Sequence, residues 1–182
     1  QNIKKGSIMS NEKIILEGCI KAFKESNEID LSDSELFEIF SLTQIHKDSS
    51  VTYENVSSSI VDGSNDGGID SIMIFINDEY IDNMDSLDNF NFTNKTNAKF
   101  IISQCKKVNS FKEGIIDKLI TTVPVLFNLE NEEELLLSRF NSDLVNQALL
   151  LTEVWKKTAT SGGKIYLDYL YISNAPSKNF NT

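Results

Sequence analysis

The chain contains too little cysteine and histidine for the common disulfide and metal scaffolds. Among 182 residues there are two cysteines, Cys19 and Cys105, and one histidine, His46. Two cysteines this far apart form no disulfide framework and fit no zinc motif. One histidine cannot build a histidine-rich metal site, so we interpret His46 as a surface or hydrogen-bonded residue rather than a ligand. Free thiols suit a reducing compartment, and we expect a cytoplasmic protein.

Long apolar runs are also missing. No segment approaches the roughly 20 apolar residues that a membrane-spanning helix needs, and none resembles a signal peptide, so we expect no membrane partner. With 40% hydrophobic residues the chain can still form a core, and its length suits one domain over residues 9–182. Residues 1–8 precede Met9 and resemble an expression remnant. A polar tail after the last predicted strand raises the expectation of a fragment that lacks a C-terminal regulatory region.

Positive charge is scarce overall but locally concentrated. The net charge of −10 argues against a protein that binds nucleic acid over its whole surface. Between residues 95 and 118, however, six lysines stand against two acidic residues, a local excess of 6 − 2 = +4. The six are Lys95, Lys99, Lys106, Lys107, Lys112 and Lys118. This basic island is either an ordinary solvated face or a surface that contacts phosphate groups.

The first third of the chain predicts two helices. Apolar residues recur at helical spacing over residues 12–27, and a second helix begins near Ser32, where Ser32 and Glu35 form a capping box, and fades near Ile45. Residues 47–55 are polar and predict a loop. Residues 56–61 predict a short strand.

Two central segments have the composition of covered strands. Residues 69–76 and 99–106 are apolar on both faces, which is typical of strands packed on both sides. The polar, acidic residues 77–97 between them predict a long connection or an extended hairpin tip.

The last third predicts two helices and a strand. One helix begins at a capping box of Ser110 and Glu113, and Pro124 should kink or end it. A long helix follows over residues 132–158, and a final strand over residues 164–173. The resulting order, α–α–β–β–β–α–α–β, is that of a three-layer α/β sandwich.

Residues of the types that bind metals or take part in catalysis lie at the ends of the two central strands. A glycine-rich turn delivers Asp70 to the first strand, and a period of two places Gln104 and Lys106 on the same side of the second. Neighbouring strands lie about 4.8 Å apart, so groups at facing strand ends can converge on one ion. Phosphodiester hydrolysis needs a hard cation held by oxygen ligands and a positive group near the phosphate. These residue types therefore predict a metal-dependent phosphodiesterase site.

The glycine turn has other interpretations. A calcium loop beginning at Asp62 would need a glutamate at its twelfth position, where this chain has Met73. A phosphate cradle at Gly67 and Gly68 would need a nucleotide-binding pattern that the sequence lacks. A plain hairpin turn remains open, since Asn and Gly readily adopt positive φ.

The sequence G-S-N-D-G-G-I-D at residues 63–70, followed by I-I-S-Q-C-K at residues 101–106, resembles the PD-(D/E)XK nuclease superfamily. More narrowly, it is similar to the N-terminal domain of AIPR-type abortive-infection phage-resistance proteins and to Mrr-like nucleases, which carry G-x-D on one strand and Q-x-K on the next. The resemblance implies an α/β fold with a three-layer α/β/α restriction-endonuclease-like core (α-β-β-β-α-β) and extra helices near the N-terminus and in the C-terminal half.

The implied activity is a Mg²⁺- or Mn²⁺-dependent endonuclease that cleaves DNA, in bacterial anti-phage defence by restriction or abortive infection. RNA as the substrate, a homodimer, and a catalytically inert nuclease-like module that binds nucleic acid or protein stay open. The glutamine in place of an acidic residue lowers the negative charge of the site and favours the inert alternative.

The resemblance also implies roles for individual residues. Asp70 would be the principal metal-binding carboxylate, joined by the side-chain oxygen of Gln104 and the backbone carbonyl of Cys105. Lys106 would orient or activate the attacking water and stabilise the transition state. Glu38, on the preceding predicted helix, is our candidate for a further catalytic and metal-binding carboxylate, although a glutamate on a helix is usually solvated.

Three more residues are candidates for supporting roles. Lys107 and Lys112 are expected to contact phosphate groups of the substrate. Asp66 either contacts the metal ligands without binding the metal itself or merely forms the turn. The Cys105 thiol is expected to be buried rather than nucleophilic, because its strand is apolar and no histidine is near in sequence.

Overall fold

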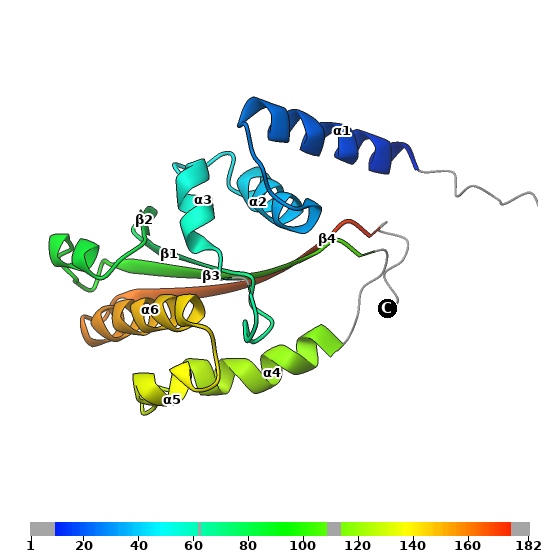
Figure 1. Cartoon of the computed structure of the whole chain (residues 1–182). Coiled ribbons are helices and arrows are strands. Elements are labelled where there is room, and N and C mark those ends of the chain that lie inside the picture. The colour runs from blue at the N-terminus through cyan, green and yellow to red at the C-terminus, as the bar shows by residue number, and fades with distance from the viewer. Residues whose placement is uncertain (1–9, 62, 109–113, 176–182) are drawn as a thin grey trace, which may run out of the picture.

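Apolar segments from the middle and the end of the chain form one mixed sheet in the computed structural model, which describes residues 10–61, 63–108 and 114–175 (Figure 1). The sheet has the order β2-β1-β3-β4, and β1 runs antiparallel to β2 and β3, whereas β4 runs parallel to β3. The strands are β1 (Ser71–Ile76), β2 (Glu79–Ile81), β3 (Asn97–Lys106) and β4 (Lys164–Ser173). The last strand has the predicted bounds, and the two central strands agree within two residues.

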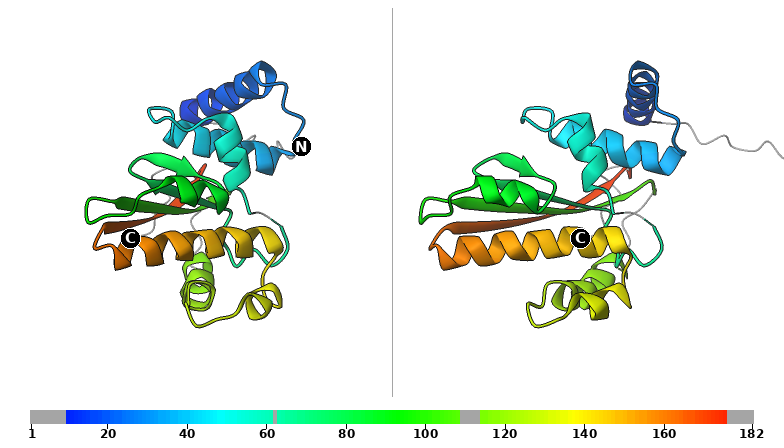
Figure 2. Two further views of the ribbon diagram at one scale, coloured as in Figure 1. Left: turned by 90° about the vertical axis from the view of Figure 1, so that its left-hand side faces the viewer. Right: turned by 60° about the vertical axis from the view of Figure 1, so that its left-hand side comes forward.

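Helices cover both faces of the sheet. Figure 1 and the two views of Figure 2 show α1 to α3 on one side and α4 to α6 on the other. Their bounds are α1 (Asn11–Ser26), α2 (Asp33–Ile45), α3 (Tyr53–Ser59), α4 (Gly114–Leu126), α5 (Glu133–Leu137) and α6 (Ser142–Thr160), with a short 3₁₀ helix η1 (Asp85–Asn89) after β2. The predicted capping box of Ser32 and Glu35 is present at the start of α2.

The core lies on both sides of β1, as the apolar pattern predicts. All six residues of β1 are buried. Ile72 and Ile74 pack into the larger cluster on the α4–α6 side, whereas Met73 and Phe75 pack on the opposite side. Within the described residues, no helix has both the length and the apolar character needed to cross a bilayer.

The predicted strand over residues 56–61 is wrong. These residues belong mostly to α3, because Thr52 and Asn55 form a capping box that starts a helix at Tyr53. The loop predicted over residues 47–55 therefore ends before Tyr53. Among the described residues, strand pairing of this segment is limited to an isolated bridge between Ile60 and Ser71.

The connection over residues 77–97 contains more structure than predicted. Asn77 and Asp78 both have positive φ and form a two-residue hairpin turn into β2. The remainder includes η1 before the chain enters β3.

The long helix predicted over residues 132–158 is two helices, α5 and α6. Asn141 separates them because its side chain accepts a hydrogen bond from the Leu144 N–H and so caps α6. In the preceding helix, α4 continues through Pro124 to Leu126 rather than ending at the proline. The capping residues predicted for α4, Ser110 and Glu113, lie outside the described residues.

Candidate active site

The sheet register brings the two motif segments side by side. β1 and β3 pair Ser71 with Ser103, so one further step places Asp70 opposite Gln104. The Asp70 N–H donates to the Ser103 carbonyl over 3.0 Å, and its carbonyl accepts from the Val61 N–H over 2.9 Å. Asp70 is thus held by its backbone on both sides, directly at the start of β1.

The Asp70 carboxylate is buried and has polar contacts from the end of β3. Only 2% of the residue is exposed. Its Oδ2 accepts the Cys105 N–H over 2.8 Å, and the Lys106 Nζ lies 3.5 Å from each carboxylate oxygen. A buried carboxylate needs such charge-assisted partners, since burial without them is costly. The Lys106 ammonium is near enough for electrostatic attraction but makes no short hydrogen bond.

Gln104 contributes a buried amide to the same face of the sheet. The residue is 3% exposed, and none of the residues that the structure describes gives its Oε1 a hydrogen bond. An unsatisfied buried acceptor costs about 1–3 kcal/mol, so its presence next to Asp70 needs an explanation. A cation or an ordered water at this position would provide one.

Glu38 projects from α2 and is buried rather than solvated. The residue is 5% exposed and lines a cavity of about 390 Å³ together with Ile39, Gly63 and Asp143. The negative charges of Glu38 and Asp70 both contribute to the raised pKa of the Cys105 thiol. Glu38 therefore remains a candidate ligand.

The Cys105 thiol is a poor nucleophile in this environment. Burial is the main cause that raises its pKa far above the ordinary value, and the negative charges of Glu38 and Asp70 add to the effect. The Lys106 ammonium opposes the shift without reversing it. The thiol packs in the apolar cluster with Phe37 and Ile39, as expected of a structural cysteine.

The glycine turn positions Asp70 through contacts with α4. Asp66 Oδ1 accepts the Gly68 N–H over 2.6 Å and the Lys118 Nζ over 2.8 Å, so this carboxylate both forms the turn and ties it to α4. Gly67 has φ +63°, and a Cβ there would lie 2.5 Å from Thr122 Cγ2. The Thr122 hydroxyl donates to the Gly67 carbonyl over 2.7 Å. Glycine is required here because α4 packs directly on the turn.

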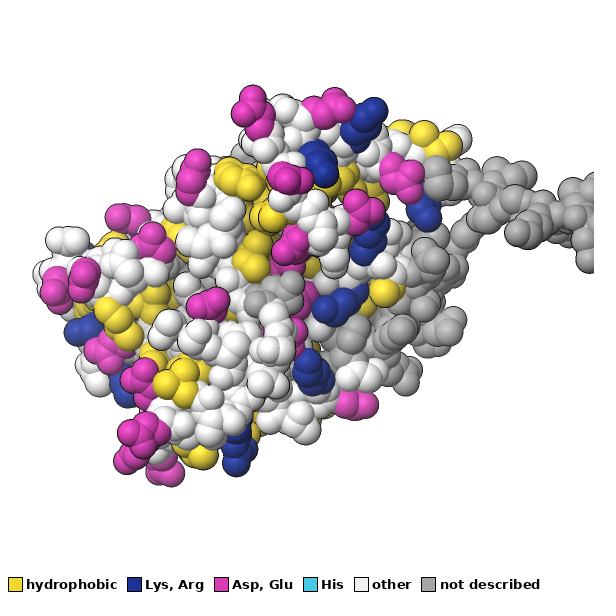
Figure 3. Space-filling view, in the orientation of Figure 1, with side chains coloured by type: hydrophobic (Ala, Val, Ile, Leu, Met, Phe, Trp, Pro, Cys, Tyr) yellow, Lys and Arg dark blue, Asp and Glu magenta, His cyan; other side chains and the backbone are white. Residues whose placement is uncertain are grey.

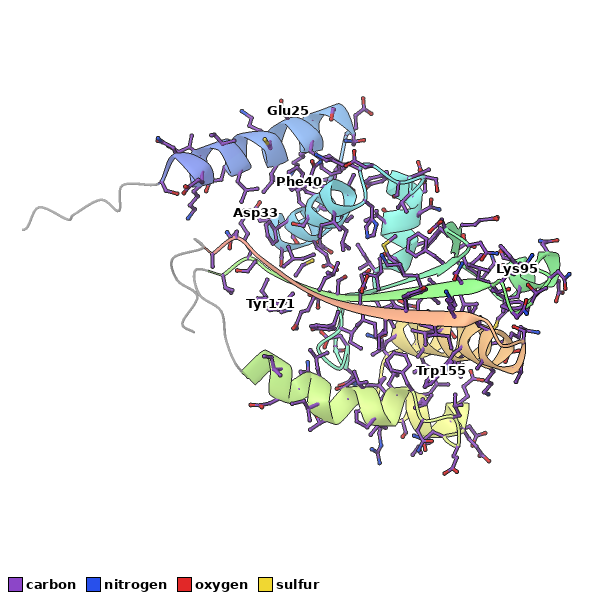
Figure 4. All side chains as sticks on the ribbon, turned by 180° about the vertical axis from the view of Figure 1, so that it is seen from behind. Glu25, Asp33, Phe40, Lys95, Trp155 and Tyr171 are labelled. Carbon is purple, nitrogen blue, oxygen red and sulfur yellow. The ribbon has the colours of Figure 1, made fainter. Side chains whose placement is uncertain are left out.

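For several residues near the site, the contacts made there were not predicted from the sequence. Lys118 and Thr122 contact the turn from α4, and the Asn141 side chain donates to the Val61 carbonyl over 3.1 Å from the start of α6. Tyr171 lies opposite Gln104 in the β3–β4 register, and Figure 4 shows it near the end of β4. The alternation of β4 could have placed Tyr171, because it fixes which residues share a face with Gln104 once the register is known.

Burial and the Asp70 charge also affect two tyrosines of β4, Tyr169 and Tyr171. Burial is the main cause that raises the pKa of Tyr169 well above its ordinary value, and Asp70 contributes. Burial likewise raises the pKa of Tyr171, and the Lys106 ammonium acts against it. Both phenols therefore stay protonated at neutral pH and can donate hydrogen bonds.

The lysines of the basic island do not form one surface. Lys106 lies beside Asp70, but Lys99 lies seven residues before Lys106 on β3, roughly 23 Å from it at strand spacing and on the opposite face. Lys95 lies at the other end of the sheet from Tyr171 (Figure 4). Lys118 is paired with Asp66. The island in the sequence is therefore spread across the fold.

Of the two lysines predicted to contact substrate, one is described. Lys107 Nζ lies 3.1 Å from Asp33 Oδ2, and Lys107 borders a groove of about 320 Å³ beside α1. The groove is also lined by Lys13, Lys21 and Lys24. Figure 3 shows acidic side chains near the middle of one face with lysine or arginine side chains beside them. Lys112 lies outside the described residues.

Carboxylates are few at the site. Within the described part of the chain, no three His, Cys, Asp or Glu side chains form a group that could hold a metal ion. Any cation here would depend on the Gln104 amide, backbone oxygens and water in addition to carboxylate.

Comparisons with known proteins give no independent guide to the activity. The chain matches no family model, no curated protein and no solved structure. The resemblance to PD-(D/E)XK nucleases therefore rests on the motif residues themselves.

Proposed function

We propose that this chain is a divalent-metal-dependent nuclease domain with a restriction-endonuclease-like core, which hydrolyses phosphodiester bonds of DNA in bacterial anti-phage defence. One observation carries the proposal: a buried carboxylate (Asp70), a buried amide oxygen without a hydrogen bond from the described residues (Gln104) and a lysine ammonium (Lys106) meet at the paired ends of β1 and β3. The succession of helix, three strands, helices and strand is consistent with it.

The residues present fit a hard divalent cation. Mg²⁺ prefers oxygen ligands, uses one or two protein carboxylates and retains several waters. Asp70 would supply a carboxylate oxygen, and Gln104 would supply its Oε1. This oxygen accepts no hydrogen bond from the described residues, and a bound cation would give it a partner. Glu38 and the Cys105 carbonyl are the further expected ligands. Mn²⁺ has similar ligand preferences and would occupy the same position. When bound, such a cation stabilises charge on the phosphate and lowers the pKa of a water.

The remaining chemistry falls to the residues around Asp70. The Cys105 N–H fixes one oxygen of Asp70 and so sets the orientation of the carboxylate. Lys106, whose Nζ lies 3.5 Å from both oxygens, would orient the attacking water and stabilise the negative charge that develops on the phosphate during in-line attack. Lys107, which follows Lys106 in the chain and borders the groove beside α1, would contact a neighbouring phosphate.

The proposal is tested by cleavage of a substrate panel. We would incubate the protein with double-stranded DNA, single-stranded DNA and RNA in Mg²⁺, in Mn²⁺ and in EDTA. We expect cleavage of DNA only with a divalent cation, and its loss in Asp70→Asn. Asparagine is the right substitution because its side-chain oxygen can still accept the Cys105 N–H. Equal cleavage by the parent protein and Asp70→Asn would overturn the site assignment.

A catalytically inert nuclease-like module is the second candidate. The net charge of −10 and the small number of carboxylates at the site favour it. A folded protein that binds DNA or RNA equally in EDTA and in Mg²⁺, and cleaves neither, would support the module. Cleavage of RNA alone in the same panel would instead identify an RNase.

A further inference from the structure

The outer edge of β4 is unpaired among the residues that the structure describes. Within the described residues β4 pairs with β3 alone, and each of its ten residues is exposed or half-buried, in contrast to the fully buried β1. An edge strand presents a row of unpaired N–H and C=O groups and is a template for pairing with another strand. Natural edges of this kind are usually short, charged or covered, whereas β4 is long and carries large apolar side chains beside its two charged residues.

Apolar side chains are exposed on both faces of this edge. Leu167 is 61% exposed and Tyr166 is 49% exposed, although the two point to opposite faces of the strand. On the α4 side, Leu167 and Tyr169 border an apolar groove of about 450 Å³ that is also lined by Ile116 and Ile120 of α4. A contiguous apolar surface of this kind marks an interaction site.

The sequence of β4 is complementary to itself when the strand is reversed. Lys164 and Asp168 stand two residues before and two residues after Tyr166. Antiparallel pairing about a two-fold axis at Tyr166 places each Lys164 opposite Asp168 of the partner subunit, and each Ile165 opposite Leu167 of the partner subunit. Oppositely charged residues directly opposite one another stabilise strand pairing.

Other registers lose this complementarity. An axis at Leu167 places Lys164 opposite Leu170 of the partner subunit, and an axis at Asp168 places the two aspartates opposite each other. Like charges directly opposite are destabilising. Of these three registers only the axis at Tyr166 places opposite charges against each other, and this self-complementarity favours a second copy of this chain as the occupant.

We propose that the chain forms a two-fold symmetric dimer through antiparallel pairing of β4 with β4, centred on Tyr166. The axis is perpendicular to the sheet, so both α4 helices lie on the same side of the joined sheet, with Ile116 and Ile120 near the seam. Lys99 Nζ already lies 3.1 Å from Asp168 Oδ2. In the dimer each Asp168 therefore lies between Lys99 of its own subunit and Lys164 of the partner subunit.

The first test is the oligomeric state of a single apolar-edge variant, measured by sedimentation equilibrium. We expect a dimer for the parent protein and a dissociation constant raised roughly a hundredfold by Leu167→Lys, because each dimer would place two lysines in the seam. Ile15→Lys is the matched control, since Ile15 is 65% exposed but lies on α1. A monomeric parent protein, or equal effects of the two variants, would overturn the proposal.

The second test examines the register of the paired strands by reversing the charges of Lys164 and Asp168. Lys164→Glu places acidic residues opposite each other, and Asp168→Lys places basic residues opposite each other, so each variant alone should dissociate about tenfold more readily. An equimolar mixture restores two opposite-charge pairs, and we expect heterodimers close to the parent affinity. Circular dichroism checks the fold, because Asp168→Lys also removes the Lys99 pair. Failure of the mixture to recover dimers would contradict pairing about Tyr166.

Discussion

The lysines at the two ends of β3 each lie beside an aspartate, but in different surroundings. Lys106 Nζ is 3.5 Å from both oxygens of Asp70, whereas Lys99 Nζ is 3.1 Å from Asp168 Oδ2. The more distant pair contains a carboxylate that is only 2% exposed, and the closer pair contains one that is 51% exposed.

The distance between two charges alone does not show how strongly they interact, because burial differs between the two pairs. An exposed pair is screened by water and contributes little. Asp70 is shielded from water, is held by the Cys105 N–H and has a buried amide opposite it, so its charge acts strongly on the groups around it. The same two residue types therefore lie in a buried polar cluster in one place and at the exposed edge of the sheet in the other.

The largest expected contrast is in cleavage. Lys106→Gln should lower the rate constant of DNA hydrolysis by about 10²- to 10⁴-fold, because it removes a positive group beside the scissile phosphate. Lys99→Gln, on the same strand, should retain the parent rate. The measurement is single-turnover cleavage in Mg²⁺ at saturating protein. Similar rates for the two variants would remove the distinction between the pairs.

The next contrast is in stability. Asp70→Ala leaves the buried Cys105 N–H without its acceptor and should lower the free energy of unfolding by about 1–3 kcal/mol. Asp168→Ala changes an exposed side chain and, at a protein concentration low enough to dissociate the proposed dimer, should stay within about 0.5 kcal/mol of the parent. Urea denaturation followed by circular dichroism measures both. If Asp168→Ala proves as destabilising as Asp70→Ala, the burial argument fails.

The smallest contrast is in the pH dependence of stability and involves His46. Burial is the main cause that lowers the His46 pKa below its ordinary value of 6.5, and the Lys99 charge adds to it. The unfolded chain therefore takes up a proton at a higher pH than the folded chain. Stability is fully present above pH 6.5 and falls as the pH drops from 6.5 toward the folded-state pKa.

Two variants test this assignment by urea denaturation between pH 7 and pH 5.5, a range chosen around the ordinary pKa of about 6.5. His46→Gln should flatten the pH dependence, and Lys99→Gln should reduce it slightly. Lys106→Gln is the control, because Lys106 does not contribute to the His46 shift. An unchanged slope in His46→Gln would show that other groups cause the pH dependence.

Periodicity predicted the parts of the fold that depend on local pattern. The bounds of β4, the two-faced burial of β1 and the common face of Gln104 and Lys106 all follow from alternation. The strand predicted at residues 56–61 failed because the Thr52 cap starts a helix that the serine-rich composition hides.

Contacts between distant segments were beyond the sequence. The packing of Thr122 on Gly67 joins residues 55 positions apart, and nothing near either residue specifies the other. The burial of Glu38 likewise depends on how α2 lies over the end of the sheet, which helical periodicity alone leaves undetermined. The sequence could not show that the lysines of the basic island lie far apart, because their positions also depend on contacts between distant segments.

The most direct test is a calorimetric titration of the protein with Mn²⁺ and with Mg²⁺, beside Asp70→Asn and Asp168→Asn. The account predicts a saturable site in the parent protein and in Asp168→Asn, and its loss in Asp70→Asn. Binding that is absent from the parent protein, or that survives in Asp70→Asn, would contradict a metal site built on Asp70 and Gln104.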